Sequence, residues 1–204
     1  MEFRQVVARR RMTRSFAEGA ITEEQLARML QVALRAPSAG FAQGVDWLVL
    51  TDEMGRGRFF RATCDPAFLA EPGPAAGILR AGAILVPVAD PSAYERRYDD
   101  TDKETSGLAG RSAQDWDVPY WIVDAAFGAM LALLAAEDEG LGALFFRLHR
   151  GTAGLEAEFG IPAGRVVIGA VAVGLLEDGN RGPVGSPGHR PRRAAGDVAH
   201  FGSW

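Results

Sequence analysis

Cysteine, lysine and histidine are scarce in this 204-residue sequence. Cys64 is the only cysteine, so the chain forms no internal disulfide, which fits a reducing cytosol. The three histidines, His149, His189 and His200, are far apart in the sequence, and no second cysteine completes a zinc-ligand spacing. We therefore expect a cytoplasmic protein without a metal site.

Motifs for several common kinds of enzyme chemistry are also missing. The sequence has no G-x-S-x-G elbow of serine hydrolases and no G-K-S/T of a P-loop. Gly140 and Gly142 follow an expected helix rather than a strand, and the third glycine of the dinucleotide fingerprint is absent. These absences argue against a hydrolase of that type, a P-loop enzyme and a Rossmann domain.

The charge and the hydrophobic runs bear on possible large partners. A net charge of −4 argues against a general nucleic-acid binder, which is usually basic. The longest apolar run, residues 125–136, is too short to cross a bilayer, and the N-terminus lacks the apolar core of a secretory signal. We predict a soluble protein with neither nucleic acid nor membrane as its partner.

Hydrophobic spacing predicts one α+β domain over residues 1–204, without repeats or a clear linker. A long helix should begin at Pro119 and end near Glu139, and it should be buried because it is apolar all round. Thr22 and Gln25 have the spacing of a helix capping box. Strands are expected at 46–51, 83–89, 143–146 and 166–173, and shorter helices at 2–11, 22–36, 55–63 and 152–159.

Three segments are expected to be irregular. Residues 65–77 are rich in proline, glycine and alanine. The polar stretch at about 92–117 predicts a long loop, either a functional lid or a mobile surface. Residues 177–204 form a C-terminal arm rich in glycine, proline and arginine, which is either disordered or packs on a partner chain.

Arginines crowd both ends of the chain. The planar guanidinium matches phosphate oxygens in a bidentate way, so one interpretation is that both ends converge on a bound phosphate. The alternative is two solvated basic patches, which charge alone favours. The clusters are Arg9, Arg10, Arg11 and Arg14 at the start, and Arg190, Arg192 and Arg193 near the end.

An ordered set of motifs favours the phosphate interpretation. Residues 10–16, R-R-M-T-R-S-F, resemble the R-R-S-x-R-x-F opening of the nitroreductase-like flavoprotein family. Residues 36–39, A-P-S-A, are similar to its A-P-S-x loop, and the apolar helix followed by G-L-G at 140–142 is similar to its A-x-x-x-G-L-G segment. The I-P and valine-rich strand at 161–174 and the tail R-P-R-R at 190–193 complete the resemblance in the family's order.

The resemblance implies a fold, a cofactor and an activity. The fold would be α+β, with a central, mostly antiparallel sheet flanked by helices around a long buried helix, in a homodimer with intertwined ends. FMN would lie at the dimer interface. The enzyme would be an FMN-dependent oxidoreductase that passes hydride through flavin N5 from NAD(P)H to a small aromatic, quinone or nitro acceptor. No side chain would be catalytic, because the flavin carries the chemistry.

The same resemblance assigns roles to individual residues. The terminal arginines would bind the phosphate, ribityl chain or N1/O2 edge of FMN, residues 37–39 would line the ring, and the backbone at 147–148 would approach N5. Apart from the resemblance, the aromatic side chains after residue 115 are candidates for a substrate wall because aromatic rings stack on flat acceptors, and the alternative is that at least two of them pack in the core. The expected cofactor-binding residues are Arg10, Arg11, Met12, Arg14, Pro37, Ser38, Ala39, Phe41, Phe146, Arg147, Leu148, Arg190 and Arg192, and the expected substrate residues are Phe41, Tyr120 and Trp121, with Trp116 as a further candidate.

Departures from the family pattern keep other functions open. Met12 replaces a serine, Phe41 replaces an asparagine, and Gly44-Val45 stand where the family has Pro-Trp. The wall of the active site should therefore be more apolar than usual. Alternatives are a specialised flavin-dependent dehydrogenase or tailoring enzyme of a biosynthetic pathway, and a non-catalytic flavin-binding protein.

Overall fold

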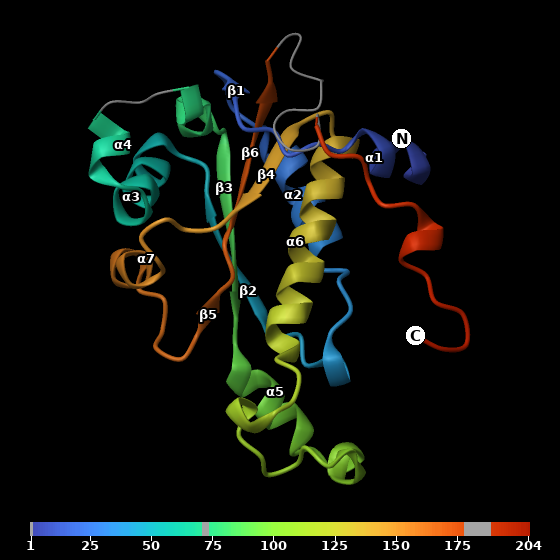
Figure 1. The fold of residues 1–204 in the computed structure, drawn as a ribbon. Helices are drawn as coiled ribbons and strands as arrows, with labels where there is room; N and C mark the ends of the chain where they lie inside the picture. Colours follow the sequence, from blue (N-terminus) through green and yellow to red (C-terminus); the bar gives the residue numbers. More distant parts are fainter. Residues whose placement is uncertain (1, 71–73, 178–188) are drawn as a thin grey trace.

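The computed structural model describes residues 2–70, 74–177 and 189–204. An antiparallel sheet lies at the centre, and helices cover both of its faces (Figure 1). Helices α2 and α6 lie on one face, α3, α4 and α7 lie on the other, and α5 lies at one end of the molecule. The helices are α1 Phe3–Arg9, α2 Glu23–Ala33, α3 Glu53–Thr63, α4 Pro66–Ala70, α5 Pro91–Tyr98, α6 Tyr120–Asp138 and α7 Ala153–Phe159.

The sheet follows the order β1-β6-β3-β2, with β4 added beside β6 and β5 beside β3. Every strand pair among the described residues is antiparallel, which confirms the predicted α+β architecture. The central strand β3 is buried along its whole length, as its continuous apolar run predicts. The strands are β1 Phe16–Ala17, β2 Val45–Leu50, β3 Ala83–Ala89, β4 Gly142–Phe146, β5 Val166–Val167 and β6 Ala170–Leu176.

Helix α6 is the long helix predicted from the apolar run. Its inner side packs on the sheet and on α2, where Leu133, Leu85 and Val171 belong to one buried cluster. The capping box predicted for α2 is present, because Thr22 and Gln25 bond each other's backbone. Because α6 packs on the sheet and on α2, its two ends have defined positions relative to the sheet.

The outer side of α6 is apolar but exposed. Ile122, Phe127 and Met130 are between 39% and 46% exposed and follow the spacing of one helical face. The prediction that an all-round apolar helix is buried therefore holds for one side of the helix within a single chain. These side chains are not fully covered by other parts of the chain that the structure describes.

Three predictions of local structure are wrong. The segment 92–117 is not one long loop, because it contains most of α5 and two 3-10 turns at Thr101–Ser106 and Ala113–Asp115. Likewise 65–77 holds α4 and the start of a 3-10 segment, Pro74–Arg80. The strand predicted at 166–173 is interrupted at Gly169, whose φ is 145° and where a Cβ would lie 2.7 Å from the Phe146 carbonyl oxygen.

Candidate functional site

The N-terminal arginine segment lies against the first residues of β4. Met12 forms a parallel bridge with Ala143, and the Thr13 N–H donates to the Ala143 carbonyl at 2.9 Å. The Met12 side chain packs against the buried clusters on both faces of the sheet. Packing therefore accounts for an apolar side chain at this position, which is half-buried.

The arginines of this segment differ in what they bind. Arg9 pairs with Glu137 on α6 at 3.2 Å, so its charge is already compensated. Arg11 donates to the carbonyl oxygens of residues 8, 9 and 10, and Arg14 donates to the Met12 carbonyl at 3.3 Å. Among the residues that the structure describes, Arg10, Arg11 and Arg14 have no acidic partner.

One nitrogen of Arg10 is buried without a hydrogen-bond partner in the described part of the chain. This atom is Nη1 of the guanidinium. A buried, charged donor without an acceptor is costly, so such an atom usually has an anion, a water or a ligand beside it. The donor set of this segment, three guanidinium groups on one short stretch, therefore fits a phosphate.

A second group of contacts fixes the segment just after these arginines. The Arg80 guanidinium donates to the Phe16 carbonyl at 2.7 Å and to the Ser15 hydroxyl at 3.0 Å. It also pairs with Glu177, which accepts from Ser15 as well. Because residues 15 and 16 are held by Arg80 and residues 12 and 13 by Ala143, the backbone of the arginine segment is fixed between β1 and β4.

The A-P-S segment forms a tight loop at the other end of α6. Ser38 begins a 3-10 turn over Ala39–Phe41, and its hydroxyl accepts from the Gln43 N–H at 3.0 Å. The Ala39 N–H donates to the carboxylate of Asp124 on α6 at 2.9 Å. Pro37 and Phe41 are exposed, whereas Ser38 and Ala39 are half-buried. The loop therefore presents an outward surface while its backbone is held from inside.

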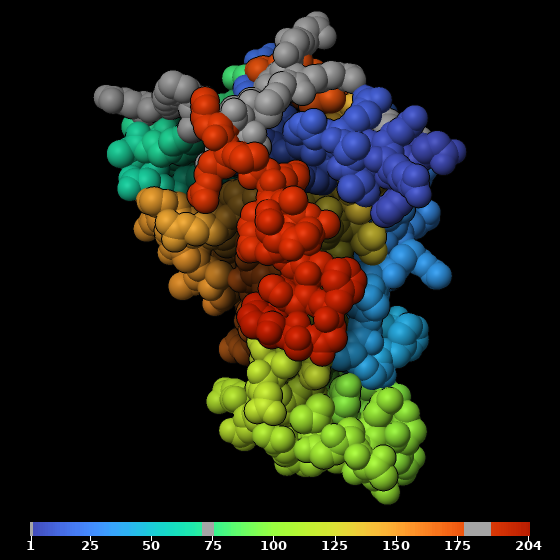
Figure 2. All heavy atoms as spheres, turned by 45° about the vertical axis from the view of Figure 1, so that its right-hand side comes forward, coloured from blue at the N-terminus to red at the C-terminus, as the bar shows by residue number. Residues whose placement is uncertain are grey.

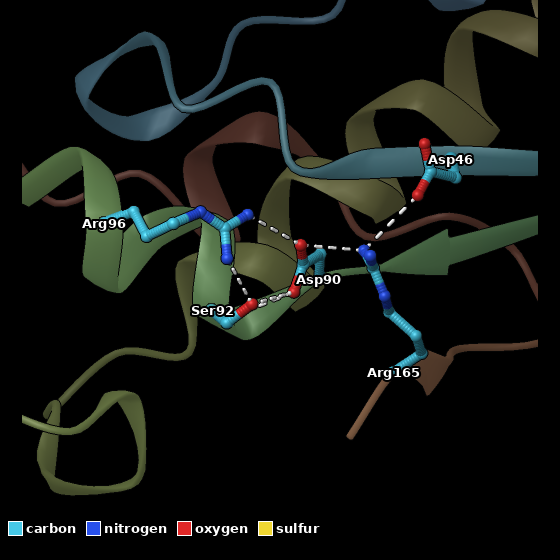
Figure 3. A network of polar contacts seen from close by, with 5 residues as sticks. All are labelled: Asp46, Asp90, Ser92, Arg96 and Arg165. Atoms are coloured by element: carbon cyan, nitrogen blue, oxygen red, sulfur yellow. Dashed lines mark hydrogen bonds and ion pairs between the residues drawn. The ribbon is translucent and has the colours of Figure 1, made fainter. Parts of the chain in front are cut away.

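Helix α5 supports this loop and is itself anchored by an ion network (Figure 3). Asp90 caps the helix by accepting from Ser92, and its carboxylate pairs with Arg96 at 3.1 Å and with Arg165 at 2.8 Å. Arg165 reaches Asp46 on β2 at 3.3 Å. Burial would raise the pKa of Asp90, but the hydrogen bonds from Ser92 and Arg96 and the charge of Arg165 hold it below its usual value.

The substitution Asp90→Asn is expected to lower the free energy of unfolding at pH 7 by about 2 kcal/mol, because it leaves Arg165 without its buried partner. A depressed native pKa stabilises the protein above the ordinary aspartate value of 3.8 and loses that effect as the pH falls through the native value. The difference between the two proteins should therefore shrink in acid. Urea unfolding at fixed protein concentration measures it.

Asp46→Asn is the matched control for that experiment. Its carboxylate contacts the same Arg165, yet its side chain is 76% exposed. Exposed ion pairs contribute little to stability, so this variant should unfold almost as the parent does. Equal effects of the two substitutions, or a difference that is constant with pH, would contradict the role given to Asp90.

The end of β4 is the third part of the predicted site. Phe146 is half-buried and makes an edge contact with Phe59, with ring centroids 6.1 Å apart. Leu148 is buried in the same core, whereas Arg147 between them is exposed. The alternation leaves Arg147 at the surface, and the approach of the 147–148 backbone to a cofactor stays a prediction.

The aromatic residues predicted as a substrate wall are mostly packed together. Trp116 and Trp121 are 6% and 8% exposed and belong to a buried cluster with Tyr94. Tyr120 is half-buried, and its ring contacts Trp116 edge-on. A substrate role for Tyr120 and Trp121 stays a prediction. In this group, Phe41 exposes the most aromatic surface, 73% of its total.

The C-terminal arginines lie on the described part of the arm. Residues 178–188, which the predicted arm includes, lie outside the described residues. From 189 to 204 every residue is exposed, and the arm runs along the side of the molecule that carries α6 (Figure 2). Arg190 and Arg192 make no ion pair with any residue that the structure describes. The predicted contact of Arg190 and Arg192 with the phosphate stays a prediction, and these side chains are available to bind a group outside this chain.

The structure brings only some of the predicted residues together. Residues 10–14 lie near the C-terminal end of α6, where Arg9 meets Glu137, and the 37–43 loop lies near its N-terminal end, beside Asp124. Asp124 and Glu137 are thirteen positions apart on the helix, which corresponds to about 20 Å. The two halves of the predicted cofactor site are thus apart within one chain.

Sequence reasoning missed the residues that hold the loop. Asp124, Tyr94 and Arg97 were not among the predicted site residues, yet each contacts the loop or the carboxylate that holds it. A signal was present, because Asp124 is a carboxylate inside an otherwise apolar helix. Such a group is buried only when it has hydrogen-bond partners.

Two further features limit the kinds of site. Within the described ranges, no group of three or more histidine, cysteine, aspartate or glutamate side chains could hold a metal ion. By length and composition alone, α6 could cross a membrane, but half of its apolar window is buried inside the protein. Its contacts with the sheet and α2 are those of a core helix in a soluble fold.

Solved structures share this fold. B. megaterium NfrA2 is 20% identical and has a TM-score of 0.75, with 100% of this chain and 75% of that chain covered. NfrA1 nitroreductase from B. subtilis is 18% identical, with a TM-score of 0.73 and coverage of 99% and 74%. A nitroreductase family protein from Clostridium difficile 630 is 16% identical, with a TM-score of 0.71 and full coverage of both chains. At these identities the likeness establishes the fold.

The sequence comparison establishes the family. No curated protein matches the chain. The family model described as Nitroreductase family matches residues 7–175, from the arginine segment through β4 to β6. That match spans most of the chain and includes the motifs at 10–16, 36–39, 140–142 and 161–174, whereas the tail motif at 190–193 lies beyond it. The protein therefore belongs to the nitroreductase family and is an oxidoreductase of that family.

Proposed function

We propose that the protein is an FMN-dependent oxidoreductase that transfers hydride from NAD(P)H to a small aromatic, quinone or nitro acceptor. The observation that carries this proposal is the arginine segment beside β4, where the buried Nη1 of Arg10 has no partner among the described residues. The charges of Arg11 and Arg14 are also uncompensated within the described part of the chain, where both bond only backbone carbonyl oxygens. A phosphate would satisfy both features.

The residues of this chain would bind and orient the cofactor rather than react with it. Arg10, Arg11 and Arg14 would hold the phosphate and place positive charge near the isoalloxazine edge, where it stabilises the reduced form. The backbone at 147–148 would lie beside the ring. When bound, FMN supplies the hydride acceptor and donor at its N5 atom.

The overall reaction balances with a two-electron acceptor. NAD(P)H gives up a hydride and becomes NAD(P)⁺, and a quinone takes up that hydride and one proton to become a hydroquinone. The proton comes from solvent, so no side chain of the protein needs to be consumed or regenerated. The reaction therefore needs no nucleophilic side chain, which agrees with the binding and orienting roles that we assign to the residues of the site.

The separation of the two half-sites supports a homodimer. If two copies pack their α6 helices antiparallel about a two-fold axis near Met130, the Asp124 end of one helix faces the Glu137 end of the other. The 37–43 loop of one protomer then approaches residues 10–14 of its partner. The exposed face of Ile122, Phe127 and Met130 would be covered by the same contact.

The C-terminal arm supports the same assembly. Val198, Phe201 and Trp204 are 48%, 92% and 101% exposed, so these side chains bury little apolar surface against the rest of the same chain. Apolar side chains on an extended arm are stable when another surface covers them. We infer that the arm wraps around the partner and carries Arg190 and Arg192 toward the shared phosphate site.

Cofactor content and turnover together test the proposal. The purified chain, incubated with FMN and desalted, should retain about one FMN per chain, oxidise NADH or NADPH, and reduce a naphthoquinone or a nitroaromatic. Flavin retention without any turnover would instead support the flavin-binding alternative. Nicotinamide-independent oxidation of an organic substrate would support the dehydrogenase alternative. A chain that cannot be loaded with FMN would contradict the proposal.

A further inference from the structure

The loop that contains Phe41 has an unusual backbone. Gly40, Phe41 and Gln43 all have left-handed φ angles, at 61°, 58° and 51°. Glycine adopts this region freely, but a phenylalanine rarely does, because its Cβ crowds the following carbonyl. Conformations of this kind persist when the surroundings determine them, and they cluster at functional sites.

A buried carboxylate holds the first half of the loop. Asp124 is 5% exposed, and one of its oxygens, Oδ2, accepts from the Ala39 N–H at 2.9 Å and from the Tyr94 hydroxyl at 2.7 Å. Burial and this hydrogen bond raise the pKa of Tyr94, so its hydroxyl stays a donor throughout the physiological range. The carboxylate thus ties α5, α6 and the loop together at one atom.

An arginine holds the middle of the loop. Arg97 Nε donates to the Gly40 carbonyl at 2.6 Å. Its two Nη atoms bond both oxygens of Asp102 at 2.7 Å, and this pairing lowers the pKa of Asp102 to about 2. The Tyr98 ring closes the other side, since a Cβ on Gly40 would lie 2.9 Å from it. The loop therefore has contacts on both sides before any ligand is present.

These contacts direct the Phe41 side chain outward. Its neighbours Ala39 and Ala42 pack on the buried aromatic cluster, while Phe41 itself is 73% exposed. An aromatic ring kept in solvent on a restrained loop is a surface prepared for another flat apolar group. The family pattern has asparagine at this position, so the ring replaces a polar contact with an apolar one.

We propose that Asp124 and Tyr94 are positioning residues that hold the 38–43 loop, and that Phe41 selects flat aromatic acceptors by stacking on them. The inference rests on the proposed function, because it concerns the acceptor of that same reaction. Fused-ring quinones and nitroaromatics should be favoured over acceptors without a flat ring. Phe41 acts by direct contact, whereas Asp124 and Tyr94 act through the loop.

The specificity test compares two acceptors of the same enzyme. A naphthoquinone can stack on Phe41, whereas ferricyanide accepts electrons without a flat ring. With both rates expressed per bound FMN, Phe41→Asn should lower kcat/KM for the naphthoquinone about tenfold relative to that for ferricyanide, mainly through KM. Phe41→Leu, which stays apolar but cannot stack, should lie between. Phe3→Asn is the control, since Phe3 is 71% exposed on α1 and has no role in the site.

The positioning role of Asp124 and Tyr94 is tested by a measurement that does not depend on enzyme activity. Hydrogen exchange of the 39–43 amides is measured in the purified full-length chain, with and without added FMN. Tyr94→Phe and Asp124→Asn should speed this exchange several-fold and shift the acceptor ratio in the same direction as Phe41→Asn. The substitution Phe41→Asn should leave the exchange as slow as in the parent, because it removes the ring and not the contacts that hold the loop.

The outcomes separate this inference from the proposed function. The acceptor role is overturned if the parent enzyme is active but Phe41→Asn lowers the reduction of naphthoquinone and ferricyanide equally. It is also overturned if the variant loses FMN or becomes monomeric, because Phe41 would then be a cofactor or interface contact. Unchanged loop exchange in Tyr94→Phe and Asp124→Asn overturns the positioning role. A parent that neither retains FMN nor oxidises NAD(P)H contradicts the proposed function, and with it the acceptor role, while the exchange result still decides the positioning role.

Discussion

Replacing Arg10 with alanine is expected to weaken FMN binding by about 10- to 100-fold, the effect of losing a hydrogen-bonded charge on a phosphate. The reason is specific to Arg10, because its Nη1 is buried and has no protein partner among the described residues. The free protein should be slightly more stable without this group, since an unpaired buried donor is removed. Fluorescence titration with FMN and urea unfolding measure the two effects.

Arg4→Ala is the control for that variant. Arg4 carries the same charge on α1, the helix that ends just before Arg10, but it is exposed. It should change FMN affinity only slightly. If Arg4→Ala and Arg10→Ala weaken FMN binding equally, the effect comes from overall charge rather than from a phosphate contact. An unchanged affinity in Arg10→Ala would remove the observation on which the proposed cofactor site depends.

A single charge on the outer face of α6 is expected to separate the dimer and release FMN. Phe127 is 46% exposed in the chain and lies close to the centre of the proposed interface. Phe127→Asp would bury an unpaired carboxylate there, which costs several kcal/mol and corresponds to more than about 100-fold in association. Light scattering should give the mass of one chain, and FMN affinity should fall although Phe127 is not a predicted cofactor contact.

Met54→Asp serves as the matched substitution on another surface. Met54 is 71% exposed on α3, which covers the opposite face of the sheet (Figure 1). This variant should remain a dimer and keep its FMN. A Phe127→Asp variant that remains dimeric would place the interface elsewhere. A monomeric variant that still binds FMN tightly would show that one chain provides the whole cofactor site.

Strong periodicity and local capping made much of the fold predictable. The run at 83–89 is the buried central strand with the predicted bounds, and the Thr22–Gln25 spacing forms the capping box that it indicates. The apolar helix after Pro119 is present as α6. These features depend on residues close together in the sequence, so the sequence carries their signal directly.

The errors arose where a local signal was overlooked or a distant contact decided the structure. Asp90 followed by Pro91 is a helix start, with a capping side chain and proline in the first turn, but the polar composition after it indicated a loop. The break at Gly169 comes from the close approach of β4, which no pattern within 166–173 reveals. Long-range packing decided that case.

The candidate site was only partly predictable for the same reason. Motif order indicated residues 10–14 and the 37–43 loop as site residues, which stays a prediction, and it did not reveal that they lie at opposite ends of α6 in one chain. Nor did it identify the contacts of Asp124 and Arg97 with the loop, which join residues more than fifty positions apart. Such contacts require the fold to be known.

The central claim is that two copies of this chain share an FMN site, and a crystal structure of the protein grown with FMN tests it most directly. We predict electron density for FMN between two protomers, with its phosphate at Arg10 of one chain and the 37–43 loop of the other chain nearby. FMN bound entirely within one chain, or bound away from the arginine segment, would contradict the account.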